Sequence, residues 1–238
     1  MSCASESPSG RTLLEFIARR WPAFAGPTAP TREALQAIVD AHGARWRLVD
    51  PKSLRTRVGP GGGVDNYETA LAKGELPTRD GSWHDAFNVL AFLSWPLAKA
   101  ALHARTLLRQ DERRRIQQRQ RGREEDALAL IDEVVLVFSG PAGLIARFEH
   151  ARVAGDLEQM DAAIRAGVRV RCFGHALLEH LALDRPVVTA GVWAIALGPD
   201  EHDDEVFARQ IAAGHFASPR FSPGVPWPHA VVLSWLLA

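Results

Sequence analysis

The chain is poor in cysteine and has no long hydrophobic run. Its 238 residues contain two cysteines, Cys3 in a polar amino-terminal stretch and Cys172 in an apolar run. Two isolated thiols make neither a disulfide framework nor a zinc site, so we expect a reducing compartment. No apolar run approaches the roughly 20 residues that span a bilayer, and the first ten residues lack the features of a secretory signal. We therefore expect a cytoplasmic protein with no membrane partner.

An excess of charge is also lacking, because 28 lysines and arginines balance 28 aspartates and glutamates. This balance gives no general attraction to nucleic acid or to anionic lipid. The local exception runs from Arg109 to Arg123, where seven arginines face only Asp111 and Glu112. No aromatic residue is interleaved there to stack on bases. We interpret residues 109–125 as a solvated helical extension or loop, and we do not expect a nucleic-acid partner.

The short signatures of familiar enzyme classes are missing as well. The chain contains no HExxH, no GxSxG and no paired CxxC. The glycine-rich stretch at 59–63 has neither the Lys-Ser/Thr of a P-loop nor the spacing of a Rossmann fingerprint. The acidic run at 200–205 lacks the ligand spacing of a calcium loop. No motif identifies a cofactor or a metal, so a site must be sought among individual polar residues.

The spacing of apolar residues predicts helices early in the chain and strands later. Short apolar runs predict strands at 127–131, 134–138, 168–173 and 187–197. This order predicts an α+β, or irregular α/β, fold with a helical amino-terminal half followed by a small mixed sheet on which helices pack. We expect one globular domain over residues 11–228, a disordered tail at 1–10 and a carboxyl-terminal tail at 229–238.

The most informative polar group stands at the start of a predicted helix over 83–94. Ser82 is the expected N-cap, and Asp85 follows it at capping-box spacing. His84 and Asn88 are four residues apart and share one helix face. His84 is a candidate acid or base near neutral pH, oriented by Asp85 or Asn88. The alternative is structural: Asp85 caps the helix and His84 is a satisfied polar residue.

A second group follows a predicted strand at the start of another helix. Gly174 precedes His175, and Glu179 lies one turn after it. Glu179 could orient the imidazole or share a divalent metal with it. The alternative is a capping histidine beside a solvated glutamate.

Three further pairs of polar residues are interpreted mainly as having structural rather than functional roles. Tyr67 and Glu68 are interpreted first as a packed tyrosine at a helix start, with a ligand or base role as the alternative. Lys99 with His103 is expected to form the polar side of a helix. Asp132-Glu133 is expected to form a turn between two strands.

Several of these residues belong to one connected pattern of short motif blocks. The blocks are Tyr67-Glu68, Gly74-x-x-Pro77-Thr78-Arg79, Trp83-His84-Asp85-x-Phe87-Asn88, Pro96, Lys99-Ala100-Ala101-Leu102, Asp126-Ala127-Leu128, Asp132-Glu133, Phe173-Gly174-His175-Ala176-Leu177-x-Glu179 and Ser218-Pro219-Arg220. By this pattern the chain resembles the bacterial family Domain of Unknown Function 3025. The resemblance covers roughly 57–227 and brings no established activity, but it implies that the polar residues in the motif blocks matter. The carboxyl terminus after Pro228 departs from the family.

Two functions are compatible with these observations. The first is an intracellular hydrolase that acts on a small or phosphorylated substrate, since a base and an anion stabiliser suffice for hydrolysis. Its catalytic residues would be His84, Asp85 and His175, and its substrate-binding residues Tyr67, Glu68, Asn88, Glu179 and Arg220. The second is a binding or regulatory module that contacts an acidic partner or nucleic acid through the arginine-rich segment. Convergence of His84 and His175 on a carboxylate would favour the enzyme.

Overall fold

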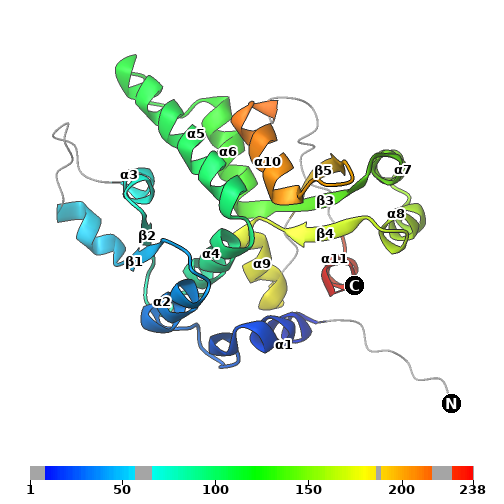
Figure 1. The fold of residues 1–238 in the computed structure, drawn as a ribbon, viewed down its shortest axis with the longest axis horizontal. Coiled ribbons are helices and arrows are strands. Elements are labelled where there is room, and N and C mark those ends of the chain that lie inside the picture. The colour runs from blue at the N-terminus through cyan, green and yellow to red at the C-terminus, as the bar shows by residue number, and fades with distance from the viewer. Residues whose placement is uncertain (1–8, 57–65, 186–188, 216–226, 238) are drawn as a thin grey trace.

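The computed structural model describes residues 9–56, 66–185, 189–215 and 227–237. Helices dominate it, and two small sheets are present (Figure 1). The elements are α1 Gly10–Arg20, η1 Pro22–Phe24, α2 Arg32–Ala41, β1 Arg47–Val49, η2 Pro51–Thr56, α3 Tyr67–Ala72, β2 Glu75–Pro77, α4 Trp83–Ser94, α5 Pro96–Arg115, α6 Arg123–Val134, β3 Val135–Pro141, α7 Ala142–Ala154, α8 Leu157–Arg165, β4 Arg169–Cys172, α9 His175–Ala182, β5 Gly191–Leu197, α10 Asp203–Ala212 and α11 His229–Leu237.

The larger sheet has the strand order β4-β3-β5. Strand β3 is antiparallel to β4 and parallel to β5, so the sheet is mixed, and the second sheet is the parallel pair β1-β2. Many helices together with two small sheets, of which the larger is mixed, make the fold α+β, which confirms the predicted class.

The central strand β3 has apolar side chains on both of its faces. Successive strand residues point to opposite faces, so Val135 and Val137 face one side while Leu136 and Phe138 face the other. The valines pack in a core with residues of α5, α6 and α10, and Leu136 and Phe138 belong to the core that includes α1, α4, α9 and α11. Figure 1 shows α5, α6 and α10 above the sheet and α9 and α11 below it.

The first predicted strand, at 127–131, is wrong, because these residues lie in α6. Three acidic residues in the first turn of α6 favour its positive amino-terminal end, and Glu125 accepts a hydrogen bond from the Gly122 N–H group. Leu128 and Ile131 are buried three residues apart, which is helical spacing. A short apolar run fits either a strand or a buried helix, and here the acidic first turn favours the helix.

Two other expectations also change. No strand was expected at residues 75–77, which form β2 and pair with β1. Residues 229–237 are not a tail but helix α11, whose Trp235 packs edge-on against Phe138 of β3. Residues 216–226, which include Arg220, lie outside the described part of the chain. Within the described part, no helix is both long and apolar enough to cross a membrane.

Candidate functional site

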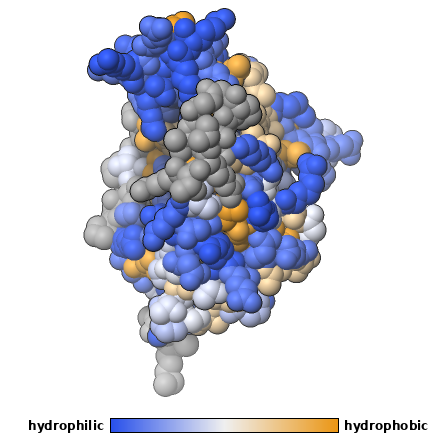
Figure 2. Space-filling view, turned by 90° about the vertical axis from the view of Figure 1, so that its left-hand side faces the viewer, coloured by the Kyte–Doolittle hydropathy of each residue, from blue (hydrophilic) through white to orange (hydrophobic). Residues whose placement is uncertain are grey.

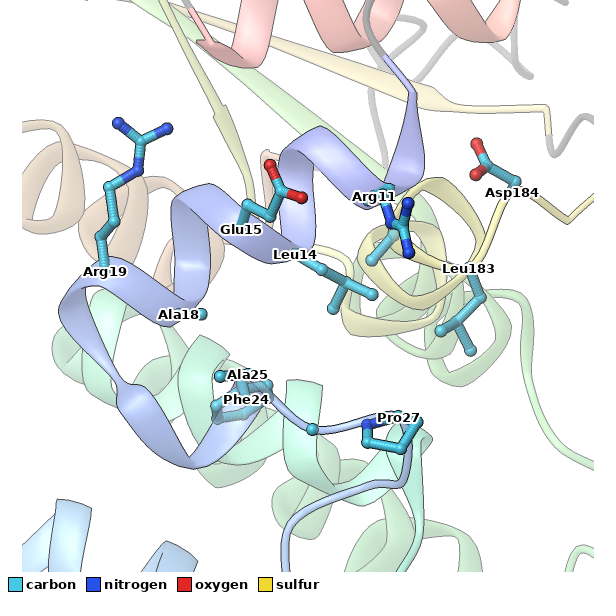
Figure 3. Close-up of a pocket in the computed structure, with 12 residues that line it drawn as sticks. Arg11, Leu14, Glu15, Ala18, Arg19, Phe24, Ala25, Pro27, Leu183 and Asp184 are labelled. Carbon is cyan, nitrogen blue, oxygen red and sulfur yellow. The ribbon is translucent and has the colours of Figure 1, made fainter.

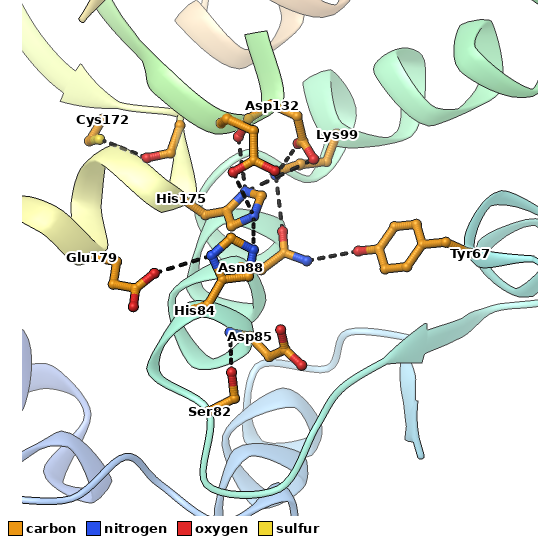
Figure 4. A network of polar contacts seen from close by, with 12 residues as sticks. Tyr67, Ser82, His84, Asp85, Asn88, Lys99, Asp132, Cys172, His175 and Glu179 are labelled. Carbon is orange, nitrogen blue, oxygen red and sulfur yellow. Dashed lines mark hydrogen bonds and ion pairs between the residues drawn. The ribbon is translucent and has the colours of Figure 1, made fainter. Parts of the chain in front are cut away.

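Two histidines from distant parts of the sequence meet between α4 and α9 (Figure 4). His84 is the second residue of α4 and His175 is the first residue of α9. Their Nε2 atoms lie 3.0 Å apart, and the ring centroids are 4.5 Å apart. The structure thus brings together the two histidines that the sequence singled out.

The other ring nitrogen of each histidine faces a hydrogen-bond acceptor. His84 Nδ1 lies 3.1 Å from Glu179 Oε2, and His175 Nδ1 lies 2.9 Å from the backbone oxygen of Asp132. A carbonyl and an ionised carboxylate can only accept, so each Nδ1 atom carries a proton. In two neutral imidazoles both Nε2 atoms would then present lone pairs to each other at 3.0 Å. A positive species, either a second proton on His84 or a metal ion, is needed between them.

Glu133 adds a carboxylate to this pair. Its Oε2 atom lies 3.4 Å from His175 Nε2, and one ligand atom from each of His84, Glu133 and His175 can be chosen so that all lie within 4.8 Å of one another. Two imidazole nitrogens and one carboxylate oxygen at such separations can bind a single divalent ion. Burial, together with the charge of Lys99, lowers the pKa of His175 to about 3, so this imidazole is neutral at pH 7. Neutral imidazole is the form that ligates a metal.

Gly174 allows the second histidine to reach this position. A Cβ atom on Gly174 would lie 2.5 Å from the backbone nitrogens of Val134 and Val135, closer than real Cβ atoms come. The absence of a side chain therefore lets the start of α9 pack directly on the end of α6. That contact places His175 beside Asp132 and Glu133 in the last turn of α6.

A buried lysine lies behind the histidine pair. The Lys99 side chain is fully buried, and its Nζ atom lies 2.5 Å from Asp132 Oδ1 and 3.1 Å from Asn88 Oδ1. Nζ also lies over the rings of Phe92 and Phe173. Burial alone would raise the pKa of Asp132, but Lys99 and two neighbouring histidines hold it well below its usual range. Lys99 thereby joins α4, α5 and α6 where they approach the site.

Further polar residues extend this buried network. Asn88 Nδ2 donates to the Tyr67 hydroxyl group at 2.7 Å, and burial raises the pKa of Tyr67 well above its usual value. His103 Nδ1 lies 2.9 Å from Glu68 Oε2. His103 Nε2 is buried and has no hydrogen-bond partner within the described structure. Asn88 therefore connects Tyr67 to Lys99, and Glu68 pairs with His103, whose Nε2 atom lies 3.9 Å from Asp132 Oδ1.

Asp85 does not join the histidines. Its carboxylate binds the guanidinium group and the backbone nitrogen of Arg79, and its own backbone N–H group donates to Ser82 Oγ. Glu179 does join them, and its second carboxylate oxygen lies 2.7 Å from Arg185 Nη1.

Four residues of this cluster were assigned to surface structure by the sequence argument. Lys99 and His103 are buried rather than forming the polar side of α5. Asp132 and Glu133 end a helix and contribute to the site, so the expectation of a turn between strands is wrong. A helical interpretation of 123–134 would have placed both acids in the last turn of a helix that faces α9.

Two surface features lie outside the site. A groove of about 940 Å³ lies along α1, η1 and the residues that follow α9, and none of the clustered site residues lines it (Figure 3). The arginine-rich stretch comprises the end of α5, a connection and the start of α6, and it forms a mostly hydrophilic projection (Figure 2). Arg109 and Arg113 are ion-paired with Glu124 and Glu125, so part of the positive charge in this stretch is already neutralised.

The fold and the site define an α+β domain with a histidine and carboxylate cluster at the junction of three helices. The chain belongs to the family described as Protein of unknown function (DUF3025), whose sequence profile matches residues 58–218. This range contains all the clustered residues. No curated protein and no solved structure gives a significant match.

Proposed function

We propose that the protein is a hydrolase that uses one divalent metal ion bound by His84, His175 and Glu133. The observation that carries the proposal is the pair of Nε2 atoms 3.0 Å apart, each on a ring whose Nδ1 atom faces an acceptor. A proton between the two Nε2 atoms would remove the repulsion of their lone pairs, but it would not involve the carboxylate of Glu133. A metal ion would bind both Nε2 atoms and this adjacent carboxylate.

The surroundings of the pair support this choice. Histidines that ligate a metal usually donate the second ring N–H group to a carboxylate or a backbone carbonyl. Glu179 and the Asp132 carbonyl occupy these two positions. Three protein ligands of mixed nitrogen and oxygen type are typical of catalytic zinc sites, which keep a coordination position open.

The division of roles follows from exposure. The side chain of His175 is 4% exposed, whereas those of His84 and Glu133 are 34% and 41% exposed. Solvent and substrate would therefore reach the centre from the side of His84 and Glu133. A divalent ion there would lower the pKa of a bound water molecule and polarise the bond to be cleaved. The protein residues would hold the ion, fix both imidazole tautomers and close the centre on the side of Lys99.

The test begins with the purified full chain after chelation. Isothermal titration with Zn²⁺ should give one site per chain, and elemental analysis of protein loaded and then freed of excess metal should confirm this ratio. The variants His84→Ala, His175→Ala and Glu133→Gln should each lose most of the affinity. The matched control is His150→Ala, because His150 is an exposed histidine on α7.

Hydrolysis is then measured on the loaded protein with phosphate and carboxylate ester panels. We expect turnover that chelation removes and that added Zn²⁺ restores. If the wild-type chain binds no divalent ion, or if the histidine variants bind as well as wild type, the metal centre is refuted. Metal binding without any turnover would instead indicate a binding module that uses the ion for structure.

A further inference from the structure

Two exposed arginines, Arg79 and Arg185, lie near the carboxylate of Glu179, which contacts His84 of the proposed centre. Arg185 follows the end of α9, and its Nη1 atom lies 2.7 Å from Glu179 Oε1. The other oxygen of the same carboxylate lies 3.1 Å from His84 Nδ1. One glutamate therefore joins this guanidinium group to an imidazole of the proposed centre.

Arg185 keeps hydrogen-bonding capacity for a ligand. A guanidinium group presents five N–H donors in a planar fork that matches phosphate and carboxylate oxygens. Glu179 engages Nη1, and the Arg185 side chain is 46% exposed. The remaining donors can therefore meet a ligand beside His84.

Arg79 lies in the loop before α4, close to the same carboxylate. Its guanidinium group is held by both oxygens of Asp85, the residue next to His84, and its side chain is 62% exposed. The hydrogen bond to Asp85 is the main cause of the raised pKa of Arg79, and the charge of Glu179 adds to it. Both arginines therefore lie within electrostatic reach of Glu179.

The charges of the site favour a negatively charged substrate once a metal is bound. The groups nearest to the proposed centre include three carboxylates, on Asp132, Glu133 and Glu179, and two cations, on Lys99 and Arg185, while Arg79 is ion-paired with Asp85. Among these groups a divalent ion would leave one net positive charge. Lys99 is fully buried, so the accessible positive groups would be the ion and the two arginines.

We propose that the substrate carries an oxyanion, a phosphate or a carboxylate group, which Arg185 binds. This inference rests on the proposed function, because the metal ion completes the positive end of the site. Arg185 would hold the anionic group while the bond to be cleaved lies at the metal.

The experiment measures anion binding to the full chain loaded with one equivalent of Zn²⁺. Isothermal titration with inorganic phosphate and, separately, with acetate identifies which oxyanion is preferred. Arg185→Ala should weaken binding of the preferred anion by about tenfold or more, because it removes charge-assisted hydrogen bonds. The anion affinity of Arg185→Lys should lie between that of the wild-type chain and that of Arg185→Ala. The matched control is Arg209→Ala, since Arg209 is 60% exposed and paired with Glu201 on another part of the surface.

Zinc affinity is measured for the same variants, so that the two proposals can fail separately. No zinc binding by the wild-type chain would overturn the proposed function and this inference with it. Zinc binding with unchanged anion affinity in Arg185→Ala would overturn only the oxyanion assignment. Weaker zinc binding in Arg185→Ala with no change in anion affinity would show that Arg185 only orients Glu179. This result too would overturn the oxyanion assignment.

Discussion

The ammonium group of Lys99 lies 2.5 Å from the carboxylate of Asp132, and the backbone carbonyl of the same aspartate receives the Nδ1–H group of His175. A buried ion pair is a costly way to hold a core together, since apolar residues of similar volume often serve as well. Here the pair fixes the end of α6, where Asp132 and Glu133 face α9. We infer that this ion pair, despite the cost of burying two charges, serves to hold the residues of the site in position.

Replacement of Lys99 should therefore be strongly destabilising. Lys99→Met leaves the Asp132 carboxylate buried without its partner, and we expect the free energy of unfolding to fall by about 3–5 kcal/mol. Urea unfolding of the metal-free chain measures this loss.

The double variant Lys99→Met/Asp132→Asn should recover part of the stability, because no unpaired charge remains. Lys52→Met is the control, since Lys52 is exposed and its replacement should change stability by less than about 0.5 kcal/mol. Equal stability of Lys99→Met and wild type would show that the pair contributes nothing.

Gly174 gives a second test of how the site is assembled. In Gly174→Ala the new Cβ atom would overlap the backbone of Val134 and Val135, so the start of α9 must move away from α6. We expect a loss of about 1–3 kcal/mol in stability from overpacking and a clear loss of zinc affinity, because His175 moves with α9. Thermal unfolding and zinc titration measure the two effects.

Gly143→Ala provides the matched control. Gly143 lies in the first turn of α7, and a Cβ atom there meets nothing within 4 Å. Alanine should therefore leave zinc affinity unchanged and should raise stability slightly, since it restricts the unfolded chain. If Gly174→Ala behaved like this control, the close packing of α9 on α6 would not be what positions His175.

How far the sequence predicts this site depends on which residues are considered. His84 and His175 could be selected because each lies in the first turn of a helix, which a capping signal predicts for α4 and a preceding strand predicts for α9. Glu179 could then be selected as well, because it lies one helical turn after His175. The acids at 132 and 133 were missed, since a short run of alanine, leucine and isoleucine before them fits a strand as well as a helix.

Lys99 shows a different limit. A lysine four residues from a histidine on a helix is typical of a solvated face, because lysine side chains are rarely buried. Its burial depends on Asp132 and Asn88, which reach it from two other helices. Such a partner set is a tertiary property, and no local spacing along α5 encodes it.

Glu179 should act on metal binding through the orientation of His84. Glu179→Ala removes the acceptor of the Nδ1–H group, so the ring loses its fixed tautomer and orientation. Loss of such a partner typically costs about 10- to 100-fold in metal affinity, which zinc titration can measure. Glu158→Ala on α8 is the control, because Glu158 is exposed. Unchanged affinity in Glu179→Ala would contradict the assigned role.

The thiol of Cys172 should be inert in the folded protein, although it lies close to the site. Burial raises the pKa of Cys172 to about 12, against a weaker lowering by Lys99, and Sγ lies 3.2 Å from the Gly174 carbonyl oxygen. The thiolate is the reactive form, so little of it is present at pH 8. In a Cys3→Ser background, the single remaining thiol should react with a dithiodipyridine reagent about 100-fold more slowly when folded than when unfolded in urea. The reaction is followed by absorbance, and the urea-unfolded sample gives the intrinsic rate of the same thiol. Comparable rates in the two states would show that Cys172 of the folded protein is accessible as a thiolate, which would contradict its raised pKa.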